Sequence, residues 1–229
     1  MTTTDNRQPM ITPLPFDSEL FGYPVGKLDL ENDWEEEEFL KNVTDFSLVY
    51  LFSKELLPVK DPRIKLVDQK LIFEKSLEQV EALPNRLTYP KKELTPELQA
   101  LAYQSGIFSR FKTDARLKSQ EFEKLYSLWI KKALEQDLVL IDSDQNGFIT
   151  VAIDQSLAKI GLFAVSDRAR GKGIGSQLIQ TAEYHSLKLG AKTLQIGTQS
   201  ANEAACNLYR KLGYELADAT HIYHFVSSK

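Results

Sequence analysis

The sequence predicts an α/β (α+β) fold in which helices pack on a mixed central sheet. Short apolar runs rich in β-branched and aromatic residues, such as residues 47–52 and 192–198, are typical of buried strands. Residues 119–133 repeat apolar side chains three and four positions apart, as an amphipathic helix does. From residue 95 onward the expected order is helix, helix, three strands, helix, strand, helix and strand, which indicates helices layered on a sheet.

Capping and turn residues set the expected limits of several elements. Thr95 and Pro96 begin the first of these helices, because Thr is a favoured N-cap and Pro suits the first helical position. Residues 107–114 are expected to form a loop. Asn146 and Gly147 are expected to form a hairpin turn between two strands.

The first ninety residues have a less regular pattern, and we expect a separate domain there. Strands are expected over residues 23–30, 47–52 and 64–74, and a short helix over residues 33–42. The four glutamates Glu35 to Glu38 are expected on a solvated face of that helix. The pattern weakens between residues 76 and 93, which predicts an N-terminal domain over residues 1–90 and a second domain over residues 93–229.

Composition and charge restrict the class of protein. The net charge of −4 and pI of about 5.5 argue against a nucleic-acid partner. No segment approaches the roughly 18 apolar residues that a membrane span needs, and residues 1–10 lack the apolar core of a secretory signal. Cys206 is the single cysteine and is expected to be a small core residue, which fits a reducing compartment. We therefore expect a cytoplasmic protein with no nucleic-acid partner, no membrane partner and no metal site.

A glycine-rich segment after an expected strand indicates an anion site. Residues 159–165 form the strand, and a helical pattern begins at Ile174. Between them lie Arg170, Gly171, Lys172 and Gly173, and Gly175 follows in the first turn. The first amides of a helix lack intrahelical partners and carry partial positive charge, so glycines and two cations beside them suit a phosphate. The alternative, that the glycines serve turn geometry alone, stays open.

The spacing of this segment resembles one family. It lacks the G-x-x-x-x-G-K-[ST] and G-x-G-x-x-G patterns and has R-x-x-G-x-G from Arg170 to Gly175. This resembles the coenzyme A loop of the GNAT N-acetyltransferases. Asn202, Ala205, Tyr209 and Gly213-Tyr214 are similar to the family's N-x-x-A-x-x-x-Y-x-x-x-G-[FY] helix. The resemblance implies the GNAT fold and acetyl-CoA as the cofactor, with its pyrophosphate on the loop and its thioester along the preceding strand.

The resemblance also implies the roles of individual residues. The cofactor-binding residues would be Phe163, Ala164, Val165, Arg170, Gly171, Lys172, Gly173, Ile174, Gly175 and Asn202. A bulge in the strand at residues 163–165 would free amides that polarise the thioester carbonyl. Tyr209 would be the general acid, since a phenol can donate a proton to a departing thiolate. A purely packing role for Tyr209 stays open, and no general base is assigned.

Further segments resemble GNAT enzymes that acetylate nucleotide-linked amino sugars. They are residues 16–22, 109–111, 125–133, 160–165 and 193–199. The implied partner is a small-molecule amino-sugar nucleotide, a dTDP-4-amino-4,6-dideoxyhexose, with Arg110, Phe111, Asp114 and Gln199 as candidate contacts. Residues 1–90 would then resemble a truncated copy of the same fold. The acceptor could instead be another small amine or a peptide N-terminus, the chain could be a non-catalytic acyl-CoA-binding module, and a homodimer stays open.

Overall fold

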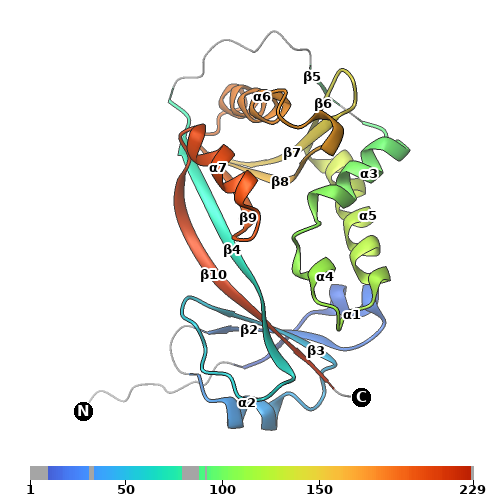
Figure 1. Cartoon of the computed structure of the whole chain (residues 1–229), viewed down its shortest axis with the longest axis vertical. Helices are drawn as coiled ribbons and strands as arrows, with labels where there is room; N and C mark the ends of the chain where they lie inside the picture. The colour runs from blue at the N-terminus through green and yellow to red at the C-terminus, as the bar shows by residue number, and fades with distance from the viewer. Residues whose placement is uncertain (1–9, 31–33, 79–87, 91, 228–229) are drawn as a thin grey trace, which may run out of the picture. The chain divides into compact units, whose positions relative to one another are not determined.

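The computed structural model describes residues 10–30, 34–78, 88–90 and 92–227 (Figure 1). The chain forms two compact units, Lys70–Ala219 and the combination of Met1–Gln69 with Thr220–Lys229. Strands β4 (Ile64–Ser76) and β10 (Glu215–Val226) each contribute residues to both units.

The larger unit, Lys70–Ala219, contains a mixed sheet with the strand order β4-β9-β8-β7-β6-β5. Strands β8 and β9 are parallel, whereas β4 with β9, β8 with β7, β7 with β6, and β6 with β5 are antiparallel. Besides part of β4, its strands are β5 (Thr88–Pro90), β6 (Leu138–Asp142), β7 (Gly147–Asp154), β8 (Leu157–Val165) and β9 (Thr193–Gln199). Its helices are α3 (Pro96–Ser105), α4 (Arg110–Thr113), α5 (Ser119–Gln136), the 3-10 helix η1 (Asp167–Ala169), α6 (Ile174–Lys188) and α7 (Glu203–Lys211).

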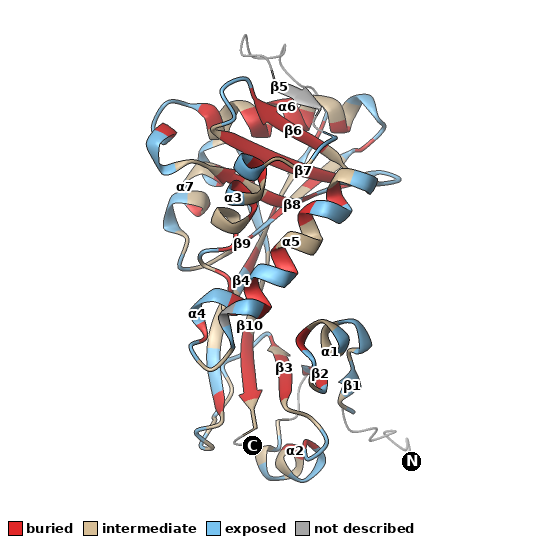
Figure 2. Cartoon of the chain, turned by 90° about the vertical axis from the view of Figure 1, so that its right-hand side faces the viewer, coloured by how far each residue is buried: buried red, intermediate tan, exposed pale blue. Residues whose placement is uncertain are grey.

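Both faces of this sheet are covered, and Figure 2 shows that β6, β7 and β8 are largely buried. On one face, Ile149 and Val151 of β7 share a core with Leu178 of α6 and Cys206 of α7. Phe148 precedes Ile149, so it points to the other face, and it is also fully buried. Helices α3 and α5 pack on each other and on β7. The predicted mixed sheet with helical layers is confirmed.

The smaller unit has its own core. Its elements are β1 (Thr12–Pro13), α1 (Pro15–Phe21), β2 (Val25–Leu30), α2 (Glu36–Asn42), β3 (Leu48–Ser53) and the adjoining parts of β4 and β10. Strand β2 is parallel to β3, and β10 is antiparallel to β3. Val25 and Leu28 of β2 are buried, and Phe39 of α2 packs edge-on against Phe225 of β10.

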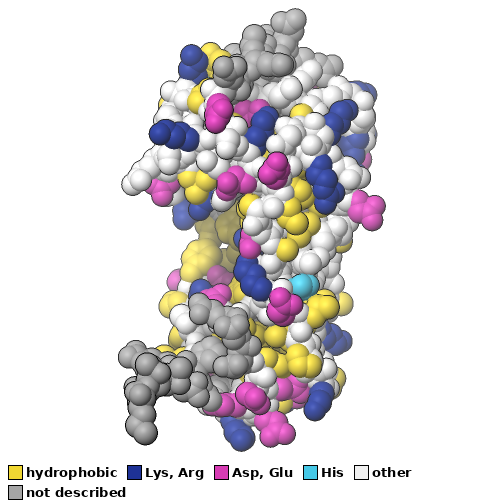
Figure 3. Space-filling view, turned by 90° about the vertical axis from the view of Figure 1, so that its left-hand side faces the viewer, with side chains coloured by type: hydrophobic (Ala, Val, Ile, Leu, Met, Phe, Trp, Pro, Cys, Tyr) yellow, Lys and Arg dark blue, Asp and Glu magenta, His cyan; other side chains and the backbone are white. Residues whose placement is uncertain are grey.

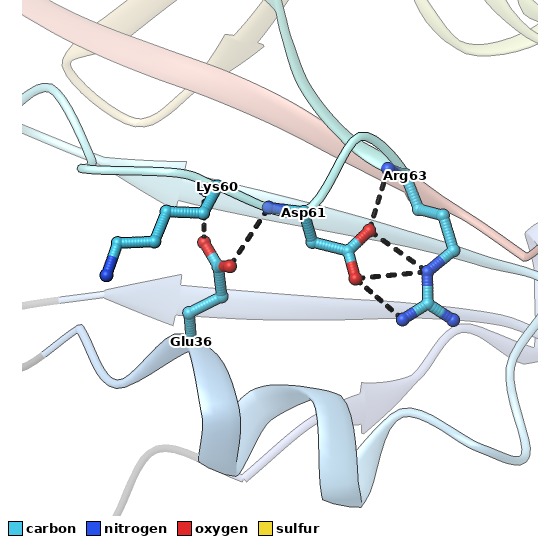
Figure 4. Close-up of polar contacts among 4 residues, drawn as sticks. All are labelled: Glu36, Lys60, Asp61 and Arg63. Atoms are coloured by element: carbon cyan, nitrogen blue, oxygen red, sulfur yellow. Dashed lines mark hydrogen bonds and ion pairs between the residues drawn. The ribbon is translucent and has the colours of Figure 1, made fainter.

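The glutamate-rich helix α2 differs from the expectation in one respect. The carboxylate of Glu36 accepts hydrogen bonds from the amides of Lys60 and Asp61 at 2.7 and 3.0 Å (Figure 4). Asp61 in turn pairs with the guanidinium of Arg63, which lowers the pKa of the Asp61 carboxyl. Glu36 therefore binds the backbone of the segment before β4. The expectation that all four glutamates lie on a solvated face is wrong for Glu36.

Local expectations elsewhere are partly wrong. Residues 107–114 contain the short helix α4, which begins where Ser109 Oγ accepts a hydrogen bond from the Phe111 amide. The hairpin turn before β7 places Gln145 at φ 54°, and Gly147 already belongs to the strand. A Cβ on Gly147 would lie 3.0 Å from Ile174 Cγ2, so close packing of α6 explains this glycine better than turn geometry does.

The compact units also divide the chain differently from the expected domains over residues 1–90 and 93–229. Much of the expected boundary falls on residues 79–87 and 91, outside the described residues. The C-terminal half of β4 pairs with β9, and the C-terminal half of β10 pairs with β3. Strand pairing therefore assigns residues 70–76 to the larger unit and residues 220–226 to the smaller one.

Candidate active site

The loop between β8 and α6 has the geometry of an anion site. Gly171 and Gly173 take left-handed φ values of 76° and 80°, which glycine adopts without steric cost. Residues 170–173 are exposed. The first hydrogen bond of α6 runs from the Gln177 amide to the Gly173 carbonyl at 3.1 Å. Within the described chain, no hydrogen bond from the amides of residues 171–176 to the protein is formed, so these donors are available to a ligand.

Gly175 lies in the first turn of α6 and permits close packing beside this loop. A Cβ there would lie 3.2 Å from Leu208 Cδ2 of α7 and 3.3 Å from the Phe163 ring of β8. Helix α7 and the end of β8 therefore meet beside the first turn of α6, where the row of free amides ends. Ile174 is buried and anchors the start of α6 in the core.

The Arg170 side chain of the loop is linked to helix α3 through Asp167. Arg170 makes an ion pair with Asp167 Oδ1 at 2.7 Å, and both side chains are mostly exposed. The same oxygen accepts a hydrogen bond from Gln104 Nε2 of α3 at 2.8 Å. Gln104 Nε2 also lies 3.2 Å from the Val165 carbonyl. Gln104 and Asp167 thus link α3 to the loop and to Arg170. These residues are far apart in the sequence, and no motif predicts their contact.

Strands β8 and β9 part before β8 ends. Their paired residues run from Leu157 opposite Thr193 to Ile160 opposite Ile196. Strand β8 continues to Val165, paired there with β7. Peptide groups in the last part of β8 that face β9 therefore lack a β9 partner, and such groups can bind an extended ligand.

The predicted bulge exists, but it lies earlier in the strand than expected. The register between β7 and β8 shifts by one residue between Ile149 and Val151. The extra residue lies at Gly161 and Leu162 of β8, because Thr150 alone faces both of them. Residues 163–165 are regularly paired with β7, so their free side results from the departure of β9 and not from a bulge at those residues.

Tyr209 of α7 lies beside this part of β8. Its ring centroid is 6.5 Å from that of Phe163 and 5.6 Å from that of Phe73. Only 2% of Tyr209 is exposed, and burial raises the pKa of its phenol well above the ordinary value near 10. Within the described residues its hydroxyl forms no hydrogen bond.

Asn202 is the N-cap of α7. Its side-chain oxygen accepts a hydrogen bond from the Ala205 amide at 3.3 Å, and its own amide donates to the Gln199 carbonyl at 2.9 Å. Asn202 therefore sets the start of the helix that carries Tyr209, whatever else it binds. Cys206 is buried in the same core, and burial raises the pKa of its thiol, so it is a packing residue as expected.

The four candidate acceptor contacts are not equally placed. Phe111 is 4% exposed and packs edge-on against Trp129 of α5. Asp114 is buried and makes a two-point ion pair with Arg116 at 2.8 and 2.9 Å. Arg110 places its guanidinium 4.3 Å from the centroid of the Phe111 ring. These contacts give Phe111 and Asp114 a structural role in the turn around α4, which the sequence does not reveal.

Gln199 is the last residue of β9, where its carbonyl receives the amide of Asn202. It is partly exposed. Of the four candidate acceptor contacts, Gln199 is therefore the one at the end of β9, directly before α7. Two histidines lie elsewhere: His185 is partly buried on α6, and His224 belongs to the smaller unit.

Other site chemistry finds no support among the described residues. None of their His, Cys, Asp and Glu side chains gather in threes in a way that could hold a metal ion. None of the helices in the described ranges is both long and apolar enough to cross a membrane. On the face drawn in Figure 3, Lys and Arg side chains are interspersed with Asp and Glu.

Comparison with known proteins shows which family the residues of this site resemble. Residues 106–214, which include the glycine loop, the end of β8 and α7, match the acetyltransferase (GNAT) family. A solved structure of a GNAT-family acetyltransferase from Novosphingobium aromaticivorans shares the fold. The TM-score is 0.52 with 15% identity, over 79% of this chain and 75% of that one.

Two curated relatives are similar in sequence over shorter stretches. A dTDP-fucosamine acetyltransferase from Escherichia coli is 30% identical over 126 residues, covering 52% of this chain and 53% of the relative. A streptothricin acetyltransferase from Escherichia coli is 40% identical over 60 residues, covering 26% of this chain and 34% of the relative. The matches thus span about half the length of the first relative and a third of the second.

Proposed function

We propose that the chain is an N-acetyltransferase that transfers the acetyl group of acetyl-CoA directly to an amine. The observation that carries this proposal is the row of unused amides at residues 171–176, together with the end of β8 that has no β9 partner. The match of residues 106–214 to the GNAT family supports the same conclusion. A diphosphate fits this loop because residues 170–173 are exposed, include Arg170 and Lys172, and lead into the positive end of α6.

The residues of the site divide the work of such a transfer. Gly171, Gly173 and the first amides of α6 bind the diphosphate, and Arg170 and Lys172 add charge. The β9-facing peptide groups of residues 163–165 orient the pantetheine arm and donate hydrogen bonds to the reacting carbonyl. When bound, acetyl-CoA supplies an activated acyl group as a thioester.

Tyr209 supplies the proton that the leaving thiolate needs. Its raised pKa keeps the phenol protonated throughout the neutral range, and its ring lies beside that of Phe163 at the end of β8. Asn202 positions it by capping α7. A phenol that stays protonated can donate a hydrogen bond or its proton to the leaving thiolate, and it cannot act as the base in the neutral range. The amine must therefore lose its proton to another group or to water, and a phenolate left after proton donation must regain a proton from water.

For the acceptor we propose the amino group of a nucleotide-linked amino-deoxysugar, a dTDP-4-amino-4,6-dideoxyhexose. The likeness to the dTDP-fucosamine acetyltransferase supports this class, since it extends over about half of the chain. Arg110 and Gln199 are the candidate contacts. The likeness to the streptothricin acetyltransferase covers a shorter stretch and supports an antibiotic amine as the second candidate.

Purified protein, acetyl-CoA and a panel of amines test the proposal. The panel contains dTDP-4-amino-4,6-dideoxyhexoses of both C4 configurations, streptothricin, a polyamine and a short peptide, and release of free thiol reports turnover. We expect the highest kcat/KM with one of the dTDP-amino sugars. Turnover confined to streptothricin or the peptide would reject the sugar nucleotide, and binding of acetyl-CoA without turnover on any amine would favour a non-catalytic module.

A further inference from the structure

The bulge in β8 is held by a side chain of the neighbouring strand. Thr150 of β7 lies opposite both Gly161 and Leu162, at the position where the register between the strands shifts. Its Oγ1 accepts a hydrogen bond from the Leu162 amide at 2.9 Å, and this contact is buried. Thr150 is 1% exposed and Leu162 is 7% exposed. A side-chain oxygen thus takes the place of the backbone carbonyl that the bulge removes.

Gly161 provides the room for this hydroxyl. A Cβ on Gly161 would lie 3.0 Å from Thr150 Oγ1, which is tighter than an ordinary contact. The glycine, the hydroxyl and the Leu162 amide therefore form one local arrangement. Nothing in the sequence signals it, because Thr150 and Leu162 are twelve residues apart and Thr is common in strands.

The position of the bulge coincides with the point where β8 and β9 separate. The last β8 residue paired with β9 is Ile160, and the bulge begins at the next residue. The extra residue increases the local twist of β8, which turns the segment at 163–165 relative to β9. The direction of its peptide groups therefore depends on the geometry at Thr150.

We propose that Thr150 is a positioning residue for acetyl transfer: its hydroxyl holds the β8 bulge so that the peptide groups of residues 163–165 face the thioester. This inference rests on the proposed function. Thr150 is buried on the far side of the bulge from the open edge and touches neither substrate. Its effect is transmitted through the Leu162 amide.

The first test replaces Thr150 by Val, which keeps the volume and removes the hydroxyl. We expect kcat per folded molecule to fall by about 10- to 100-fold, because small misplacements of reacting groups have effects of this size. The KM for the amine should change little. Thr150→Ser, which retains the hydroxyl, should restore most of the rate. In exchange experiments the Leu162 amide should lose protection in the Val variant and keep it in the Ser variant.

A matched control separates positioning from general core damage. Thr181 of α6 is also 1% exposed, and its hydroxyl donates to the Gln177 carbonyl at 2.8 Å. Thr181→Val removes an equally buried hydroxyl from the same unit without changing β7 or β8. If Thr150→Val lowers kcat per folded molecule no more than Thr181→Val does, the inference is wrong. If Thr150→Val does not fold, Gly161→Ala replaces it as the test, because the new methyl group crowds the Thr150 hydroxyl from an exposed position. We expect Gly161→Ala to lower kcat as well. An unchanged kcat in this variant would overturn the inference.

Failure of this inference can be told apart from failure of the proposed function. A wild-type chain that binds acetyl-CoA but acetylates no amine rejects the proposed transfer. Calorimetric titration with acetyl-CoA then decides the role of Thr150, because Thr150→Val must weaken binding and Thr150→Ser must restore it. A wild-type chain that binds no acetyl-CoA overturns both.

Discussion

Replacing Tyr209 by Phe isolates the hydroxyl that the proposed mechanism uses. The aromatic contacts with Phe73, Phe163 and Tyr214 are made by the ring, which Phe retains. The hydroxyl makes no hydrogen bond within the described structure, so no partner is left unsatisfied. The free energy of unfolding should therefore change by less than about 1 kcal/mol.

The expected loss of activity is much larger than this change in stability. A positioned general acid contributes about 10²- to 10⁴-fold to a rate, which corresponds to about 3–5 kcal/mol of activation free energy. We expect kcat to fall by about that factor in Tyr209→Phe. The Kd for acetyl-CoA should stay nearly the same, since the phenol acts on the leaving sulfur and contributes little to binding of the diphosphate.

The assay compares kcat, acetyl-CoA affinity and urea unfolding for Tyr209→Phe and Tyr214→Phe. Tyr214 is a matched control because it is buried in the same core, its ring centroid is 6.3 Å from that of Tyr209, and its hydroxyl is sealed from solvent. Its replacement should leave kcat nearly unchanged. Equal rates for wild type and Tyr209→Phe, or equal losses in both variants, would refute the assignment of Tyr209 as the acid.

Three further outcomes follow from the structure. Gly173→Ala places a side chain in the left-handed region and should lower the free energy of unfolding by about 1–2 kcal/mol. It should also weaken acetyl-CoA binding, as measured by calorimetry. The control Gly190→Ala, at φ 96°, should cost similar stability without changing the binding of acetyl-CoA. Asp114→Asn breaks the two-point pair with Arg116 and should lower the free energy of unfolding in urea by about 2 kcal/mol. This loss is smaller than that expected for a fully buried ion pair, because Arg116 is partly exposed. A raised KM for the amine would instead show that Asp114 binds the acceptor. Burial raises the pKa of the Tyr214 phenol above 10, so its contribution to stability is complete below about pH 10 and is lost as the pH rises further, and Tyr214→Phe should flatten this alkaline decline in thermal melts.

The sequence by itself determined the features that depend on neighbouring residues. The apolar run at residues 159–165 predicted a strand, and the change of pattern after the glycine-rich segment predicted a helix start at Ile174; the structure has β8, η1 and α6 in that order. Thr95 caps α3, as its type and the following proline predicted. Asn202 and Tyr209 lie on one helix, at its cap and two turns later. These features could be predicted because capping, turn conformation and helical periodicity are decided within a few residues.

Tertiary structure alone decided what depends on contacts between distant residues. Pairing of β10 with β3 placed residues 220–226 in the smaller unit, against the expected division of the chain. Phe111, a candidate acceptor contact, is buried and packs edge-on against Trp129 of α5. The bulge, where the Leu162 amide donates to Thr150 Oγ1, lies at the point where β8 leaves β9, two residues before the expected segment. Strand partners and burial are properties of the packed sheet, and local preferences within one segment do not specify which distant segment will lie beside it.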